Sequence, residues 1–157
     1  MEVQITDIEV SRIAGVRVQL EKNSSPYEER YFVWTESLLT AQFQSTEVSG
    51  GVIDAWHHSF IFTEIEYHED QEMFYFTEGT AIMLFADTDG RSVDMESLQA
   101  VRIPKGTQLV IEKGKGHFVA MAEGSEPVKM IVVAPKMEAP RVALKESVRA
   151  VSGGDRQ

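Results

Sequence analysis

The sequence predicts an all-β protein that folds as a sandwich or a barrel. Short runs of β-branched and aromatic residues recur at spacings of about 8–12 residues, and turn-forming residues separate them. No long stretch keeps the apolar period of an amphipathic helix. With 157 residues, 43% of them hydrophobic, the chain can build one core. We expect a single domain over residues 1–151 and a disordered tail over residues 152–157.

The predicted strands follow one another closely along the chain. They cover residues 3–8, 15–20, 29–34, 42–48, 60–67, 73–76, 80–86, 100–103, 107–111, 118–122 and 129–134. Glycine, proline, asparagine and aspartate, which turns favour, stand between many of them. After Pro140, the spacing of Val142, Leu144, Val148 and Val151 predicts a short C-terminal helix over residues 139–150 that packs outside the barrel. Residues 92–99 are expected to add one helical turn.

The composition excludes several classes of function. Lys and Arg number 15 against 25 Asp and Glu, and the resulting net charge of −10 repels nucleic-acid backbones and anionic membrane surfaces. There is no cysteine, which excludes disulfides, thiolate catalysis and sulfur-ligated zinc. No apolar run approaches the ~20 residues of a membrane span, and the first residues lack a signal-peptide pattern. We expect a cytoplasmic protein that binds neither nucleic acid nor membranes.

Side-chain alternation in the predicted strand over residues 60–67 marks a candidate site. Successive strand residues point to opposite faces, so Glu64, Glu66 and, just beyond the strand, His68 share one face. A polar face of this kind is solvated in many antiparallel sheets. The residues that follow favour a binding or catalytic site instead.

The stretch 66–79 reads E-x-H-x3-E-x6-G. Alternate strand residues place Glu66 and His68 on the same side, and a turn returns Glu72 on the neighbouring strand. Gly79 stands where a tight turn most easily takes a positive φ. The pattern resembles the first sequence motif of the cupins, with Glu66 in the position of that motif's first histidine.

The second half of the cupin pattern lies downstream, where a Pro-x-Gly turn at residues 104–106 precedes His117 by a further strand and turn. The stretch 61–121 is similar to the ureidoglycolate lyase family, a branch of the cupins. The similar segments occur in the same order at nearly the same spacing. They are Glu66-Tyr67-His68, Met73-Phe74-Tyr75, Gly79, Asp87-Thr88-Asp89-Gly90, Leu98-Gln99-Ala100-Val101 and Gly114-Lys115-Gly116-His117-Phe118. Upstream of this stretch, Glu29-Arg30-Tyr31 also resembles an early Glu-Arg-Tyr of that family.

This resemblance covers roughly residues 27–135 and implies both a fold and an activity. The fold is a double-stranded β-helix, the cupin or jelly-roll barrel. The activity is a carbon–nitrogen lyase reaction that releases urea and glyoxylate from a hydroxy-acid urea adduct.

Four side chains make up the candidate site: Glu66, His68, Glu72 and His117. Two imidazoles and two carboxylates without sulfur suit a divalent ion such as Zn, Mn, Fe or Ni, which would polarise a substrate carbonyl or hydroxyl. We assign these four residues catalytic and metal-binding roles. A structural alternative stays open, in which His68 is a buried hydrogen-bonded residue, Glu72 pairs with a lysine, and no cofactor is bound.

Three further residues are candidates for substrate binding. Glu64 shares a face with Glu66 and is a candidate second acid–base group. Lys113 and Lys115 flank the glycine before Gly116-His117 and would hold a substrate carboxylate at the rim of the site. The alternative for both lysines is a solvated charge in a hairpin turn.

The sequence as a whole favours a small-molecule enzyme, similar to ureidoglycolate lyase, that acts on a small organic acid inside the barrel. Two alternatives stay open: a cupin that binds a metal, a sugar or an organic acid without catalysis, and a structural subunit with a filled barrel. The apolar N-terminal strands, residues 3–8 and 15–20, predict a homodimer in which sheet edges are covered by the partner.

Overall fold

The computed structural model describes residues 1–153, and its regular secondary structure is almost wholly β-strand. The one helical element among these residues is η1, a 3-10 turn over Glu21–Asn23. The strands are β1 Glu2–Asp7, β2 Val16–Leu20, β3 Tyr27–Glu29, β4 Phe32–Trp34, β5 Ser49–Ala55, β6 Ile61–Glu66, β7 Glu72–Glu78, β8 Thr80–Thr88, β9 Val93–Pro104, β10 Thr107–Ile111, β11 Gly116–His117, β12 Met121–Ala122, β13 Val128–Ala134 and β14 Arg141–Ser152. The all-β prediction is confirmed. Of the predicted tail, Ser152 ends β14, and residues 154–157 lie outside the described residues.

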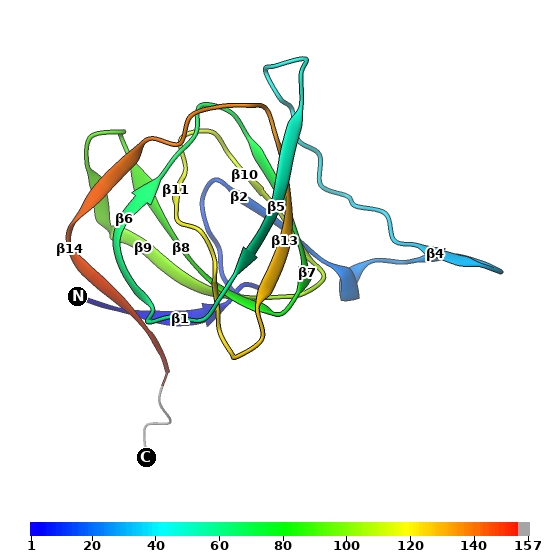
Figure 1. Ribbon diagram of the computed structural model, residues 1–157, viewed down its shortest axis with the longest axis horizontal. Coiled ribbons are helices and arrows are strands. Elements are labelled where there is room, and N and C mark those ends of the chain that lie inside the picture. Colours follow the sequence, from blue (N-terminus) through cyan, green and yellow to red (C-terminus); the bar gives the residue numbers. More distant parts are fainter. Residues whose placement is uncertain (154–157) are drawn as a thin grey trace.

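The strands form a closed mixed barrel and a second sheet beside it (Figure 1). The larger sheet has the order β11-β6-β14-β1-β9-β8-β12, and an additional pairing of β11 with β8 closes six of its strands into a ring. The smaller sheet has the order β2-β10-β7-β13-β5. A third, two-stranded sheet, β3-β4, extends away from the barrel as a hairpin (Figure 1).

Strand β8 divides the core into two apolar clusters. Its residues alternate, so that Met83 and Phe85 join a cluster with the inner face of the five-stranded sheet. Ile82 and Leu84 join the other cluster, whose members come mainly from β1, β6, β8, β9 and β14 and which therefore fills the ring. Because both faces of β8 are covered, residues 81–86 form an unbroken run of buried apolar side chains.

The C-terminal segment is a strand, and the prediction of a helix there is wrong. β14 is one of the six strands of the ring, and it pairs in parallel with β1 and antiparallel with β6. Its register against β6 shifts between Ala143 and Val148, but the buried residues Val142, Leu144, Val148 and Ala150 all follow one alternation. Within the shift Glu146 is exposed where an apolar residue would continue that alternation, and the gap it leaves between Leu144 and Val148 resembles a helical spacing. The helical turn expected within residues 92–99 is also wrong, because this stretch begins β9.

The region before β6 differs from the sequence prediction as well. Residues 42–48, expected as a strand, form no ladder, and Gln44 N–H instead donates to Asp70 Oδ2 at 2.8 Å. The strand of this region is β5, which begins at Ser49, directly after the predicted strand ends. It contains Gly50-Gly51, where the sequence suggests a turn. Gly50 has a φ of +128°, and a Cβ built there would lie 1.9 Å from the carbonyl oxygen of Val132 on β13. The glycine therefore serves close backbone approach within a strand.

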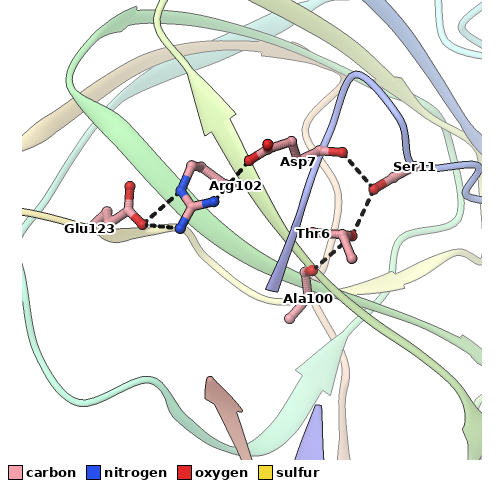
Figure 2. Close-up of polar contacts among 6 residues, drawn as sticks. All are labelled: Thr6, Asp7, Ser11, Ala100, Arg102 and Glu123. Carbon is pink, nitrogen blue, oxygen red and sulfur yellow. Dashed lines mark hydrogen bonds and ion pairs between the residues drawn. The ribbon is translucent and has the colours of Figure 1, made fainter. Parts of the chain in front are cut away.

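A polar network joins the end of β1 to β9 and to the loop after β12 (Figure 2). The Arg102 guanidinium donates to Glu123 Oε1 at 2.7 Å through Nε and to Asp7 Oδ1 at 2.8 Å through Nη1. These two carboxylates raise the pKa of Arg102 further above its ordinary value. On the other side of β1, Ser11 Oγ donates to the backbone carbonyl of Asp7, and its hydroxyl contacts Thr6 Oγ1, each at 2.8 Å. The network fixes the turn that leads from the barrel into the second sheet.

The burial of β14 can be tested with one substitution. Val148 is fully buried in the ring and pairs with Phe62 of β6, so Val148→Ala should lower the free energy of unfolding by about 2 kcal/mol. Lys145→Ala, at an exposed position of the same strand, should change it by no more than about 0.5 kcal/mol. Urea denaturation followed by circular dichroism measures both. If the two substitutions lowered the free energy of unfolding equally, the side chain of Val148 would not be buried in the core.

Candidate metal and substrate site

The pairing of short strand β11 brings together residues that lie about fifty positions apart. His117 is opposite Glu66 of β6 and also opposite Phe85 of β8, so β11 bridges the two strands that close the ring. The bridge is tight, because a Cβ at Gly116 would lie 2.3 Å from Ile65 Cδ1 and 2.9 Å from a backbone oxygen of β8. A glycine directly before the histidine is therefore what allows the imidazole to reach the site.

The turn between β6 and β7 supplies the other two candidates. His68 follows β6 by two residues, and its backbone carbonyl accepts a hydrogen bond of 2.8 Å from Gly114 N–H. Glu72 begins β7, and its side chain is almost buried. Asp70 stabilises the turn between them, because Oδ1 accepts from Gln71 N–H and Oδ2 accepts from Gln44 N–H, each at 2.8 Å.

Backbone carbonyls set the tautomer of both histidines. His68 Nδ1 lies 2.9 Å from the carbonyl oxygen of Glu138, and His117 Nδ1 lies 3.1 Å from that of Lys115. A carbonyl can only accept, so each Nδ1 carries its hydrogen and donates. In its neutral form, each imidazole then presents an Nε2 lone pair to the site. This is the arrangement by which proteins orient histidines that bind metal ions.

Glu72 faces both of these nitrogens. Its Oε2 is buried, lies 3.2 Å from His68 Nε2 and 3.1 Å from His117 Nε2, and accepts no hydrogen bond. In the neutral tautomers, lone pairs on three atoms therefore converge, which is unfavourable unless a positive charge lies among them. Ligand atoms of Glu66, His68 and His117 all lie within 4.8 Å of one another. The donor set thus fits a divalent ion held by these three residues, with the Glu72 carboxylate beside it.

These four side chains form the polar end of one cavity of about 280 Å³. The structure thus brings all four predicted residues together, and their chemical roles remain predictions. The rest of the lining is apolar or glycine and comes from β5, β7, β8, β13 and the segments after β11 and β13. It consists of Gly50, Gly51, Val52, Ile53, Phe74, Met83, Val119, Ala120, Met130, Val132, Ala134, Pro135 and Met137.

The three predicted substrate-binding residues lie outside this lining. Glu64 forms an ion pair of 2.5 Å with Arg141 at the start of β14. Lys115 is buried, and its Nζ donates to Asp87 Oδ1 at 2.6 Å, so its charge is already matched. Lys113 is exposed in the turn before β11. The sequence identifies the polar end of the cavity but not its apolar wall, whose inward-facing strand residues look like ordinary core positions.

Replacing Glu72 by glutamine should have opposite effects on folding and on metal binding. The amide could donate to one Nε2 lone pair, so we expect Glu72→Gln to raise the stability of the metal-free protein by about 1 kcal/mol, or about 2–4 °C in Tm. It should weaken binding of zinc by about tenfold or more, because a negative charge is lost. Differential scanning fluorimetry and competition with a zinc chelator measure the two effects. Glu64→Gln, outside the cavity, is the matched control and should leave zinc affinity unchanged.

The closed mixed β-barrel has the cupin fold. Solved cupin-fold structures superpose on it. The chain is 10% identical to the WlaRB TDP-quinovose 3,4-ketoisomerase from Campylobacter jejuni, with a TM-score of 0.52 over 80% of this chain and 89% of that one. It is 13% identical to the dTDP-4-dehydrorhamnose 3,5-epimerase from Bacillus anthracis, with a TM-score of 0.51 over 85% of this chain and 79% of that one.

The fold assignment rests on these two structural likenesses. An oxalate decarboxylase mutant from Bacillus subtilis is 16% identical over 61% of this chain, with a TM-score of 0.44, and the chain spans only 23% of that protein's length. No protein-family model matches the sequence, and no curated protein matches it either. The cupin prediction is confirmed as a fold, and these comparisons do not show the ureidoglycolate lyase family. No helix among the described residues is long and apolar enough to cross a membrane.

Proposed function

We propose that the protein is a cupin enzyme that holds a divalent metal ion with Glu66, His68 and His117 and acts on a small molecule in the adjoining cavity. The observation that carries this proposal is the convergence of two oriented Nε2 atoms on the unpartnered Oε2 of Glu72. A bound divalent ion supplies Lewis-acid polarisation of a carbonyl or hydroxyl oxygen.

The chain's own residues would perform the remaining tasks. The carbonyls of Glu138 and Lys115 keep both imidazoles oriented. Glu72 Oε2 accepts no hydrogen bond from the protein, so it is available to take a proton from a bound substrate and return it. Phe74 and Met83 belong to the apolar wall that limits the access of water to the reacting oxygen.

Metal analysis of protein purified without chelator tests this proposal first. We expect close to one equivalent of a divalent metal ion per chain, and turnover that disappears after chelation and returns when the ion is restored. Stoichiometric metal without turnover of any small-molecule panel would favour the alternative of a non-catalytic binding cupin. A chain that binds no divalent ion would contradict the proposed enzyme and any metal-binding cupin.

Ureidoglycolate lyase activity is the specific reaction suggested by the sequence resemblance. It can be assayed by the formation of glyoxylate, with His68→Ala as the control. In this reaction the metal ion alone would have to hold the substrate's carboxylate, because neither Lys113 nor Lys115 lines the cavity. The lining therefore supports the general class of small-molecule cupin enzyme more strongly than this particular substrate.

We also propose that the protein forms a homodimer. The sequence predicts that two N-terminal strands cover the partner's edges, but β1 pairs with β14 and β9 of its own chain and has no free edge. β2 and β5 are the open edges of the five-stranded sheet. Light scattering at micromolar protein concentration should give the mass of a dimer, and the mass of a monomer would contradict the proposal.

A further inference from the structure

The charges around the cavity restrict what it can bind. Among the described residues, its lining includes the carboxylates of Glu66 and Glu72 and no lysine or arginine. Two cationic side chains next to the site are already paired, since Arg141 contacts Glu64 and Lys115 contacts Asp87. When His68 and His117 bind a metal ion as neutral ligands, no side chain of the lining can neutralise an anionic ligand.

A divalent ion would balance the site without any contribution from the ligand. Its two positive charges match the carboxylates of Glu66 and Glu72, and histidines that bind metal ions are neutral. A carboxylate ligand would add an unmatched negative charge beside a largely apolar wall, which is unfavourable because partial burial reduces its hydration. An uncharged ligand adds no charge to the site.

The apolar wall of the cavity suits an apolar group. Phe74 and three methionines, Met83, Met130 and Met137, form part of this wall. Methionine side chains are flexible and polarisable, so such a wall adapts to aliphatic groups of different shape. At the edge strand β5, a Cβ added to Gly51 would meet no atom within 4 Å, which shows that there is room at this part of the lining.

We propose that the cavity selects an uncharged small molecule, with an oxygen that reaches the metal position and an aliphatic or aromatic body that contacts the methionines, and discriminates against carboxylates. This inference rests on the proposed metal-binding function. It names the class of substrate and separates the protein from enzymes whose substrates are organic acids.

A pair of ligands that differ only in charge tests the inference. The full chain loaded with cobalt(II) is titrated with 2-hydroxy-4-methylpentanamide and with 2-hydroxy-4-methylpentanoate, and the visible spectrum of the cobalt reports binding. Both ligands offer a hydroxyl, a carbonyl and the same apolar chain. We expect the amide to bind about tenfold more tightly, although carboxylates are ordinarily the better ligands for such ions.

A change of charge at Gly51 provides a second test with a matched control. Gly51→Lys introduces an ammonium group where a side chain has room, and should shift the ratio of the two dissociation constants by about tenfold in favour of the carboxylate. Gly51→Gln, similar in length and uncharged, should leave that ratio close to the wild-type value.

The outcomes separate the inference from the function on which it rests. If the wild type holds no cobalt, or if His68→Ala holds it equally well, the metal site fails and the inference fails with it. If cobalt is retained through His68 but the carboxylate binds as tightly as the amide, the inference is wrong while the metal site stands. The inference is equally wrong if neither ligand changes the spectrum.

Discussion

His68→Ala and His117→Gln should each lower the affinity for zinc or another divalent ion by about 100-fold or more, while the β-sheet signal in circular dichroism stays near that of the wild type. Each variant removes one Nε2 from a set whose ligand atoms all lie within 4.8 Å of one another. Glutamine is chosen at position 117 because that side chain is buried, and a polar residue can still donate to the carbonyl of Lys115. Element analysis after gel filtration measures the metal content.

The control for these variants is a histidine outside the cavity. His58 is exposed in the loop between β5 and β6, and His58→Ala should keep the full metal content. Retention of metal by His68→Ala would show that His68 does not hold the ion, and it would contradict the proposed site. The structural alternative already fails in one respect, because among the described residues Glu72 contacts two histidines and not a lysine.

Gly50→Ala should be the most destabilising of the substitutions considered for the fold, lowering the free energy of unfolding by about 3 kcal/mol or more. The new Cβ would lie 1.9 Å from the carbonyl oxygen of Val132, and the φ of +128° is unfavourable for any residue with a side chain. Since the obstacle is backbone of the paired strand β13, rotation of a side chain cannot relieve it.

The neighbouring glycine provides an internal comparison. The Cβ that Gly51→Ala adds would meet no atom within 4 Å. Because glycine weakens a strand, the free energy of unfolding should stay unchanged or rise by up to about 1 kcal/mol. Urea denaturation of the two variants side by side measures the difference. If they unfold at the same urea concentration, β5 does not approach β13 as closely as described.

The polar part of the candidate site could be predicted because its residues follow local rules. Glu66 and His68 are two positions apart, so strand alternation places them on one side, and Gly79 indeed takes a positive φ, +74°. The location of His117 required the resemblance to cupin motifs, since no local rule relates residues separated by fifty positions. The partners of Lys115 and Glu64 depend on the ring's closure, so the sequence did not reveal that these charges are matched within the protein.

Most strands were predictable, and the errors have a common origin. β8 and β13 have continuous β-branched or apolar runs, and both were recognised close to their observed bounds. The predictions for β14 and β5 are wrong because long-range pairing decides their conformation. The exposed Glu146 interrupts the apolar alternation of the first strand, and glycines needed for close approach imitate a turn in the second. Intrinsic propensity is a weak guide where long-range pairing dominates.

The pairing of β1 with β14 also determines when the protein can finish folding. The first strand is complete after Asp7, yet one of its two neighbours in the ring begins only at Arg141. At about 5–20 residues synthesised per second, β1 waits on the order of ten seconds for that neighbour. During translation the barrel therefore remains an open sheet with an unpaired edge, and its closure is a late event that joins the two ends of the described chain.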